Sequence, residues 1–77
     1  MKKVIIYSTP TCGWCHRTKE YLREKGVSFE DKDVSRDRAA AMEMVKKSNQ
    51  MGVPVIDIEG SILIGFDQGG INKLLGL

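Results

Sequence analysis

The sequence has no strong excess of either charge and no long hydrophobic run. Its 77 residues carry 12 basic and 10 acidic side chains, a formal net charge of +2. Nucleic-acid binding needs a clustered basic face, and we interpret the doublets Lys2–Lys3 and Lys46–Lys47 as solvated surface instead. The apolar run from Val4 to Tyr7 is too short for a secretory signal or a membrane span. These absences favour a cytoplasmic protein without nucleic-acid or membrane partners.

The chain is also short and poor in cysteine. A domain of this size buries only roughly 60% of its unfolded surface, and no linker, repeat or low-complexity segment divides the sequence. We therefore expect a single domain over residues 1–77. Its only cysteines are Cys12 and Cys15. In a reducing compartment such a pair is more often catalytic or metal-binding than a structural staple.

Hydrophobic periodicity predicts alternating strands and helices. A β-branched run at 3–8 reads as a buried strand, and helical spacing begins near Cys15. Gly26 is expected just past the end of the first helix, and Asn49 and Gly52 are expected to close the second. Asp67 is expected to cap the last helix, and Glu59–Gly60 to form a tight turn. The expected order is strand 3–8, helix 15–25, strand 27–31, helix 36–47, strand 53–58, strand 61–64 and a final helix after 67. This β-α-β-α-β-β-α order predicts an α/β fold with one four-stranded mixed sheet flanked by helices.

Apolar spacing also assigns the helix faces. In the first helix we expect Trp14, Thr18, Tyr21 and Leu22 near one stripe, and charged residues such as Lys19 in water. Ser35 is the expected N-cap of the second helix. Residues predicted to face inward there are Ala39, Met42 and Val45.

The segment Cys12–Gly13–Trp14–Cys15 carries the chemistry. Cysteines three apart at a helix start can form a disulfide and reopen it without unfolding the domain. The free N–H groups and the dipole of the helix favour a negative sulfur at Cys12, and in such motifs the first thiol is commonly ionised near neutral pH. Cys15, one turn inside, should be shielded and keep a more ordinary thiol pKa than Cys12. We therefore expect Cys12 to attack a substrate disulfide and Cys15 to resolve the mixed disulfide.

Three other interpretations of this motif remain open. Zinc usually takes four ligands, whereas His16 is the only further candidate beside the cysteines. Cys12-x-x-Cys15-His16 is also the haem-attachment pattern of c-type cytochromes, but that chemistry requires export. A permanent structural disulfide is the third alternative. We expect no metal site.

Val53–Pro54 is a second signal, about forty residues after the cysteines. Proline cannot donate to a sheet ladder and belongs at the first residue of a strand or at an edge. A trans proline would merely start the strand. A cis bond, which the strand–C-x-x-C–helix context favours, would turn the backbone of Val53 outward to pair with an extended substrate.

These residues resemble the glutaredoxin family of the thioredoxin fold over essentially the whole chain. The resemblance rests on 7–15, on Gly52–Val53–Pro54 and on Gly65–Phe66–Asp67, and is closest to short bacterial glutaredoxin-like proteins of the YruB type. It implies an enzyme that reduces protein disulfides or glutathione mixed disulfides, with glutathione as co-substrate and no tightly bound cofactor. We also expect the chain to be a monomer. The substrate-binding residues that it implies are Thr11, Trp14, Val53, Pro54, Gly65, Phe66 and Asp67.

Three departures from the family pattern bear on glutathione. Thr9 stands where many glutaredoxins have a lysine for the glycine carboxylate, Gly52 replaces a threonine, and Ile64 replaces a glycine. The first departure removes a charge contact with glutathione. Two alternatives to a glutathione-dependent enzyme stay open. One is an NrdH-like redoxin reduced by thioredoxin reductase, and the other is a protein that holds an iron–sulfur cluster bridged by two Cys12 thiolates and external thiols. A colourless, metal-free protein after anaerobic purification would exclude the second.

Overall fold

Seven elements follow one another in the predicted β-α-β-α-β-β-α order. The computed structural model describes residues 2–77, so the domain predicted for 1–77 extends one residue beyond the described part. The elements are β1 (Val4–Ser8), α1 (Gly13–Glu24), β2 (Glu30–Asp33), α2 (Arg38–Ser48), β3 (Val55–Ile58), β4 (Ser61–Ile64) and α3 (Gln68–Leu75).

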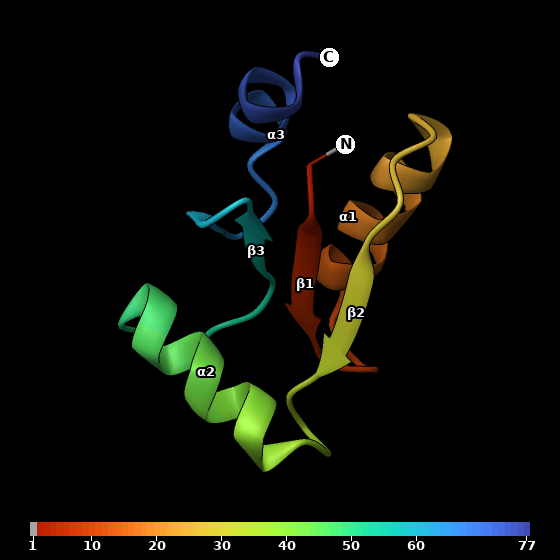
Figure 1. The fold of residues 1–77 in the computed structure, drawn as a ribbon. Coiled ribbons are helices and arrows are strands. Elements are labelled where there is room, and N and C mark those ends of the chain that lie inside the picture. The colour runs from red at the N-terminus through yellow and green to blue at the C-terminus, as the bar shows by residue number, and fades with distance from the viewer. Residues whose placement is uncertain (1) are drawn as a thin grey trace.

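The strands form one mixed sheet in the order β2-β1-β3-β4. β1 runs parallel to β2 and antiparallel to β3, and β4 returns antiparallel to β3. Helix α2 covers one face, and α1 and α3 lie on the other (Figure 1). The parallel pair needs the α1 crossover, whereas the antiparallel pair needs only a hairpin turn. The predicted fold class is confirmed.

All five residues of β1 are buried, because helices cover both faces of this central strand. Side chains alternate between the faces of a strand. Ile6 accordingly packs with Leu22 of α1 and Ile71 of α3, whereas Tyr7 packs with Met44 of α2. β1 is thereby fixed from both sides. Its carboxyl end, which leads into the turn before the cysteine motif, is therefore packed on both faces.

Several local predictions are confirmed. Gly26 has a φ of +70° just after α1, and Asn49 ends α2 in the left-handed conformation. Glu59 and Gly60 both have positive φ in the β3–β4 turn, as a tight two-residue hairpin requires. The Oδ1 of Asp67 accepts a hydrogen bond from the N–H of Gly70 at 2.9 Å, as expected of an N-cap.

The predicted second strand at 27–31 is wrong at both ends. Pairing with β1 begins only at Glu30 and continues to Asp33. Val27 and Phe29 pack against the apolar cluster beneath α1 before the strand begins. Their alternation therefore reflects a loop that lies on the core, not a hydrogen-bonded ladder.

The predicted start of the second helix is also wrong, and of its predicted inward face only Val45 is confirmed, because it packs against the apolar cluster under α2. The N–H and Oγ of Ser35 both donate to Asp33, so Ser35 lies in a turn, and Asp37 caps α2 by accepting from the N–H of Ala40. The buried residues of the helix are Ala40 and Met44, whereas Met42 is 59% exposed. Apolar residues recur at helical spacing on two adjacent faces of this helix, and the face that contains Ala40 and Met44 packs against the sheet.

Two lysines assigned to water are held by the fold instead. Lys19 of α1 is only 8% exposed and pairs with Asp31 at 2.8 Å. Lys47 pairs with Asp57 at 2.6 Å and donates to the hydroxyl of Tyr7 at 2.9 Å. A third expectation also fails, because Trp14 does not join the buried stripe of α1 and is 60% exposed.

The polar network under α2 predicts loss of stability in acid. Hydrogen bonds from the Tyr7 hydroxyl (2.6 Å) and Lys32 (2.9 Å) hold the pKa of Glu43 at about 2, below its ordinary value of 4.5. As the pH falls, the Glu43 carboxylate is therefore protonated in the unfolded chain before it is protonated in the folded protein. The stabilisation that ionised Glu43 contributes is complete above pH 4.5 and is lost as the pH falls toward 2. We expect urea unfolding to show a stability advantage of the wild type over Glu43→Gln at pH 7 that shrinks by pH 3.

Glu20→Gln is the matched control for this prediction, because Glu20 lies on the exposed side of α1, away from the network. It removes one carboxylate with no expected change in the acid profile. A Glu43→Gln effect of equal size at both pH values would contradict the assigned role of the Glu43 carboxylate.

Candidate active site

Cys12 is the N-cap of α1, at the point where the chain leaves the carboxyl end of β1. Its backbone N–H donates to the carbonyl of Thr9 at 3.3 Å, which closes the turn between the two elements. Its Sγ accepts a hydrogen bond from the N–H of Cys15 at 3.1 Å. The first turn of α1 contains no acidic side chain, so the helix dipole acts unopposed on the Cys12 sulfur.

The two cysteines differ in burial. Both are free thiols; Cys12 is partly exposed, whereas Cys15 is fully buried. Burial, reinforced by the hydrogen bond to Cys12, raises the pKa of the Cys15 thiol. The predicted shielding of Cys15 is confirmed, and burial one turn inside α1 places the pKa of its thiol above the ordinary value.

Val53 and Pro54 lie beside Cys12, although they are about forty residues away in the sequence. The Val53–Pro54 bond is cis, as predicted. The carbonyl oxygen of Val53 is 3.9 Å from the Sγ of Cys12. The carbonyl of Pro54 accepts from the N–H of Gly65 at 2.8 Å, which ties this segment to the end of β4.

A groove of about 230 Å³ opens next to Cys12. Its lining residues are Trp14, Val53, Pro54, Gly65 and Phe66. The rings of Trp14 and Phe66 are 6.3 Å apart, and the guanidinium of Arg17 lies 5.7 Å from the centre of the Trp14 ring. The lining therefore consists of apolar and backbone groups and carries no charged side chain.

The structure brings together five of the seven predicted substrate-binding residues in this groove. Thr11 is exposed in the turn just before Cys12, and Asp67 follows the groove residue Phe66 in the sequence. The carboxylate of Asp67 caps α3, and its backbone N–H donates to the carbonyl of Gly65 at 3.1 Å. The backbone N–H of Asp67, a residue that the family resemblance assigns to substrate binding, therefore already has a partner.

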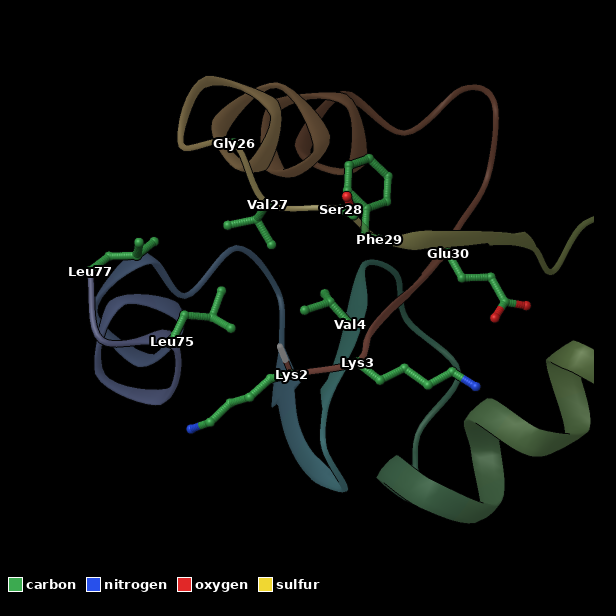
Figure 2. Close-up of a pocket in the computed structure, with 10 residues that line it drawn as sticks. All are labelled: Lys2, Lys3, Val4, Gly26, Val27, Ser28, Phe29, Glu30, Leu75 and Leu77. Atoms are coloured by element: carbon green, nitrogen blue, oxygen red, sulfur yellow. The ribbon is translucent and has the colours of Figure 1, made fainter.

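A larger cavity, of about 630 Å³, lies at the opposite end of β1 (Figure 2). Figure 2 shows it between the start of β1, the loop after α1 and the last residues of the chain, with Val4, Val27 and Leu75 on its wall. Neither cysteine lines it. The larger cavity is therefore separate from the site around Cys12.

Sequence reasoning missed the polar residues beneath the cysteine motif. Lys19, Ser8 and Asp31 hydrogen-bond to one another on the α1 side of the sheet. The burial of Lys19 could have been predicted from its spacing, because Lys19 follows Cys15 by four residues and both lie on the buried face of one helix.

Within residues 2–77, no three histidine, cysteine or acidic side chains are grouped so as to hold a metal ion. Helices long and apolar enough to cross a membrane are likewise not found in the described part of the chain.

Comparison with known proteins identifies the family. The glutaredoxin family profile matches residues 4–63. A glutaredoxin-like 8.6 kDa protein of the rubredoxin operon of Clostridium pasteurianum is 51% identical over 91% of this chain and 93% of its own length. The chain belongs to the glutaredoxin family. Glutaredoxin 3 of Escherichia coli is 38% identical over 97% of this chain and 99% of that protein.

A solved structure supports the same assignment at the level of the fold. The glutaredoxin-like NrdH-redoxin of Escherichia coli superimposes with a TM-score of 0.84, at 29% identity, over 94% of this chain and 93% of that chain. As a member of the glutaredoxin family, the protein is a thiol–disulfide oxidoreductase.

Proposed function

We propose that residues 1–77 act as one domain that reduces disulfides through Cys12 as nucleophile and Cys15 as resolving thiol. The observation that carries this proposal is the asymmetry of the pair. The Cys12 sulfur is partly exposed and accepts the N–H of Cys15 at a helix N-terminus, whereas Cys15 is buried. The Cys12 sulfur attacks first, because it is accessible and its anion is stabilised at the helix N-terminus. The shielded Cys15 thiol can then attack only the mixed disulfide that has formed at Cys12.

The reaction follows from these positions. The Cys12 thiolate attacks one sulfur of the substrate disulfide, the S–S bond breaks, and the departing sulfur takes the electron pair and then a proton. Cys12 now carries the substrate as a mixed disulfide. Cys15, as a thiolate, attacks the Cys12 sulfur, closes the Cys12–Cys15 disulfide and releases the second substrate thiol. An external thiol can release the substrate in place of Cys15.

The groove next to Cys12 is the proposed binding site for the chain that carries the disulfide. The backbone of Val53 faces the Cys12 sulfur, so an extended segment attached to that sulfur can pair with Val53 in the manner of an added strand. Trp14, Pro54, Gly65 and Phe66 supply the apolar walls. Thr11 and Asp67 border the groove in sequence, and we propose that they contact the ends of the substrate.

We propose glutathione as the electron donor in the cytoplasm, transient complexes with disulfide-containing proteins, and a monomeric chain with no resident cofactor. Family membership supports glutathione. The uncharged lining of the groove and the likeness to NrdH-redoxin favour a second candidate, in which thioredoxin reductase supplies the electrons.

An assay with two donors distinguishes these candidates. The protein is supplied with a small disulfide and either glutathione with glutathione reductase or thioredoxin reductase, each with NADPH. We expect turnover with glutathione. Turnover with thioredoxin reductase but not with glutathione would overturn the choice of electron donor and leave the proposed roles of the cysteines intact.

Thr9→Lys probes the same question from the protein side. In the family pattern a lysine at this position holds a carboxylate of glutathione, and an exposed ion pair is worth about 0.2–1 kcal/mol. We therefore expect Thr9→Lys to lower the KM for a glutathione mixed disulfide by a factor of roughly 1.4 to 5, with kcat unchanged. Lys46→Thr, which removes an exposed cation from α2, is the control with no expected effect on KM.

A further inference from the structure

Beneath the cysteine motif lies a charged group that the proposed reaction does not yet use. Lys19 is 8% exposed, although lysine is among the residues least often buried. Its ammonium donates to Asp31 at 2.8 Å and to the Oγ of Ser8 at 3.3 Å, and that Oγ donates to the other oxygen of Asp31 at 2.7 Å. The cation is therefore fixed by two strands and cannot swing freely into water.

The direction of the Lys19 side chain places its charge near Cys15. Side chains on a helix point back toward the helix N-terminus and cover the turn that precedes them. Lys19 lies four residues after Cys15 in α1, and both belong to the buried face of that helix. Ser8, to which the ammonium donates, is the last residue of β1. The ammonium is thus held between the end of β1 and the turn that contains Cys15.

Cys15 needs such a charge for its part in the reaction. A thiol attacks a disulfide as the thiolate, and burial raises the pKa of Cys15. Among the titratable groups around this thiol, Cys12 raises the pKa further and Lys19 lowers it. From β2, Asp31 faces Lys19, whereas His16 of α1 is exposed and bonds to the carbonyl of Pro10.

We propose that Lys19 is a positioning residue for the resolving step, whose buried ammonium, anchored by Asp31 and Ser8, stabilises the thiolate of Cys15. The inference rests on the proposed role of Cys15. In the step, the Cys15 thiol gives its proton to solvent and its sulfur attacks Cys12. The bond between Cys12 and the substrate sulfur breaks, and the departing thiolate takes the electron pair and a proton from solvent.

Stopped-flow absorbance with an aromatic disulfide, 5,5′-dithiobis(2-nitrobenzoate), separates the two attacks. The reduced protein should release one thionitrobenzoate when Cys12 attacks and a second when Cys15 resolves. Removal of the charge by Lys19→Met should slow the second release about tenfold at pH 7 and displace its pH profile upward by about one unit. The first release should keep its rate. Lys19→Arg, which keeps the charge, should restore the wild-type profile.

Lys47→Met is the matched control, because Lys47 also pairs with an aspartate of a neighbouring strand but lies on the α2 side of the sheet. It should lower stability and leave both releases unchanged. If Lys19→Met does not fold, Lys19→Gln, which can still donate to Asp31, gives the same comparison. Coincident pH profiles for the wild type and the uncharged variants would overturn the inference. A wild-type protein that releases only one thionitrobenzoate per chain and stays labelled at Cys12 would instead overturn the proposed role of Cys15.

Discussion

Cys12→Ser is expected to abolish disulfide reduction, whereas Cys15→Ser should retain part of the glutathione-dependent activity. Serine keeps the size of the side chain but loses the nucleophilic sulfur. Without Cys12 no mixed disulfide forms, because Cys15 is fully buried and cannot reach a substrate. Without Cys15 the mixed disulfide at Cys12 still forms, and glutathione can release the substrate in a second exchange.

The measurement is steady-state reduction of two substrates with glutathione and its reductase, one a glutathione mixed disulfide and the other a protein disulfide. Cys15→Ser should lose more activity on the protein disulfide, since that substrate needs the intramolecular resolving step. Both variants should keep the wild-type circular dichroism spectrum, which separates lost chemistry from lost structure. An active Cys12→Ser together with an inactive Cys15→Ser would reverse the assigned roles.

The second large effect is expected in the core. Ile6 lies at the middle of β1, is fully buried and packs between α1 and α3. Truncation of a buried isoleucine to alanine costs about 2–5 kcal/mol, and a small domain has a total stability of only about 5–15 kcal/mol. Ile6→Ala should therefore remove a large fraction of the stability and shift the urea midpoint strongly downward.

Ile64→Ala is the matched control, because it deletes the same atoms at the end of the edge strand β4, where Ile64 is 58% exposed. Exposed substitutions usually change stability by less than about 0.5 kcal/mol. Equal losses in the two variants would contradict the assignment of Ile6 to the central core. Such a result would show that the denatured state, not packing in the folded state, sets the response.

Much of the fold was predictable because its signals are local. The β-branched run of β1 indicates a strand buried on both faces, and Glu59–Gly60 indicates a tight turn. Asp67 and Gly26 mark a helix start and a helix end through their own backbone preferences. Each of these features depends on a few neighbouring residues, so the sequence contains the whole physical reason for it.

What could not be predicted depends on partners distant in the sequence. Lys19 looks like a surface residue on a helix until β2 brings Asp31 beside it. Lys47 likewise looks solvated until β3 supplies Asp57. Met42 and Met44 are chemically identical, and only the packing of α2 against β1 and β3 decides which of them is buried.

The candidate site divides in the same way. The cysteine pair and its helix-start geometry follow from spacing alone, and the groove residues follow from the family resemblance. The degree of burial of Cys15, the partner of the Asp67 N–H and the cation beneath the motif required the packed structure. These are also the features that bear on the choice of electron donor and on the resolving step.

Reversible oxidation, followed by intact-protein mass spectrometry, tests the central claim most directly. The protein is equilibrated with reduced and oxidised glutathione, alkylated and weighed, and the linked peptides are mapped after digestion. The proposed mechanism predicts an oxidised monomer lighter by two hydrogens, with Cys12 joined to Cys15, that returns fully to the dithiol when reductant is added. Oxidation that yields only disulfide-linked dimers, or a Cys12–Cys15 bond that cannot be reopened in the folded protein, would contradict it.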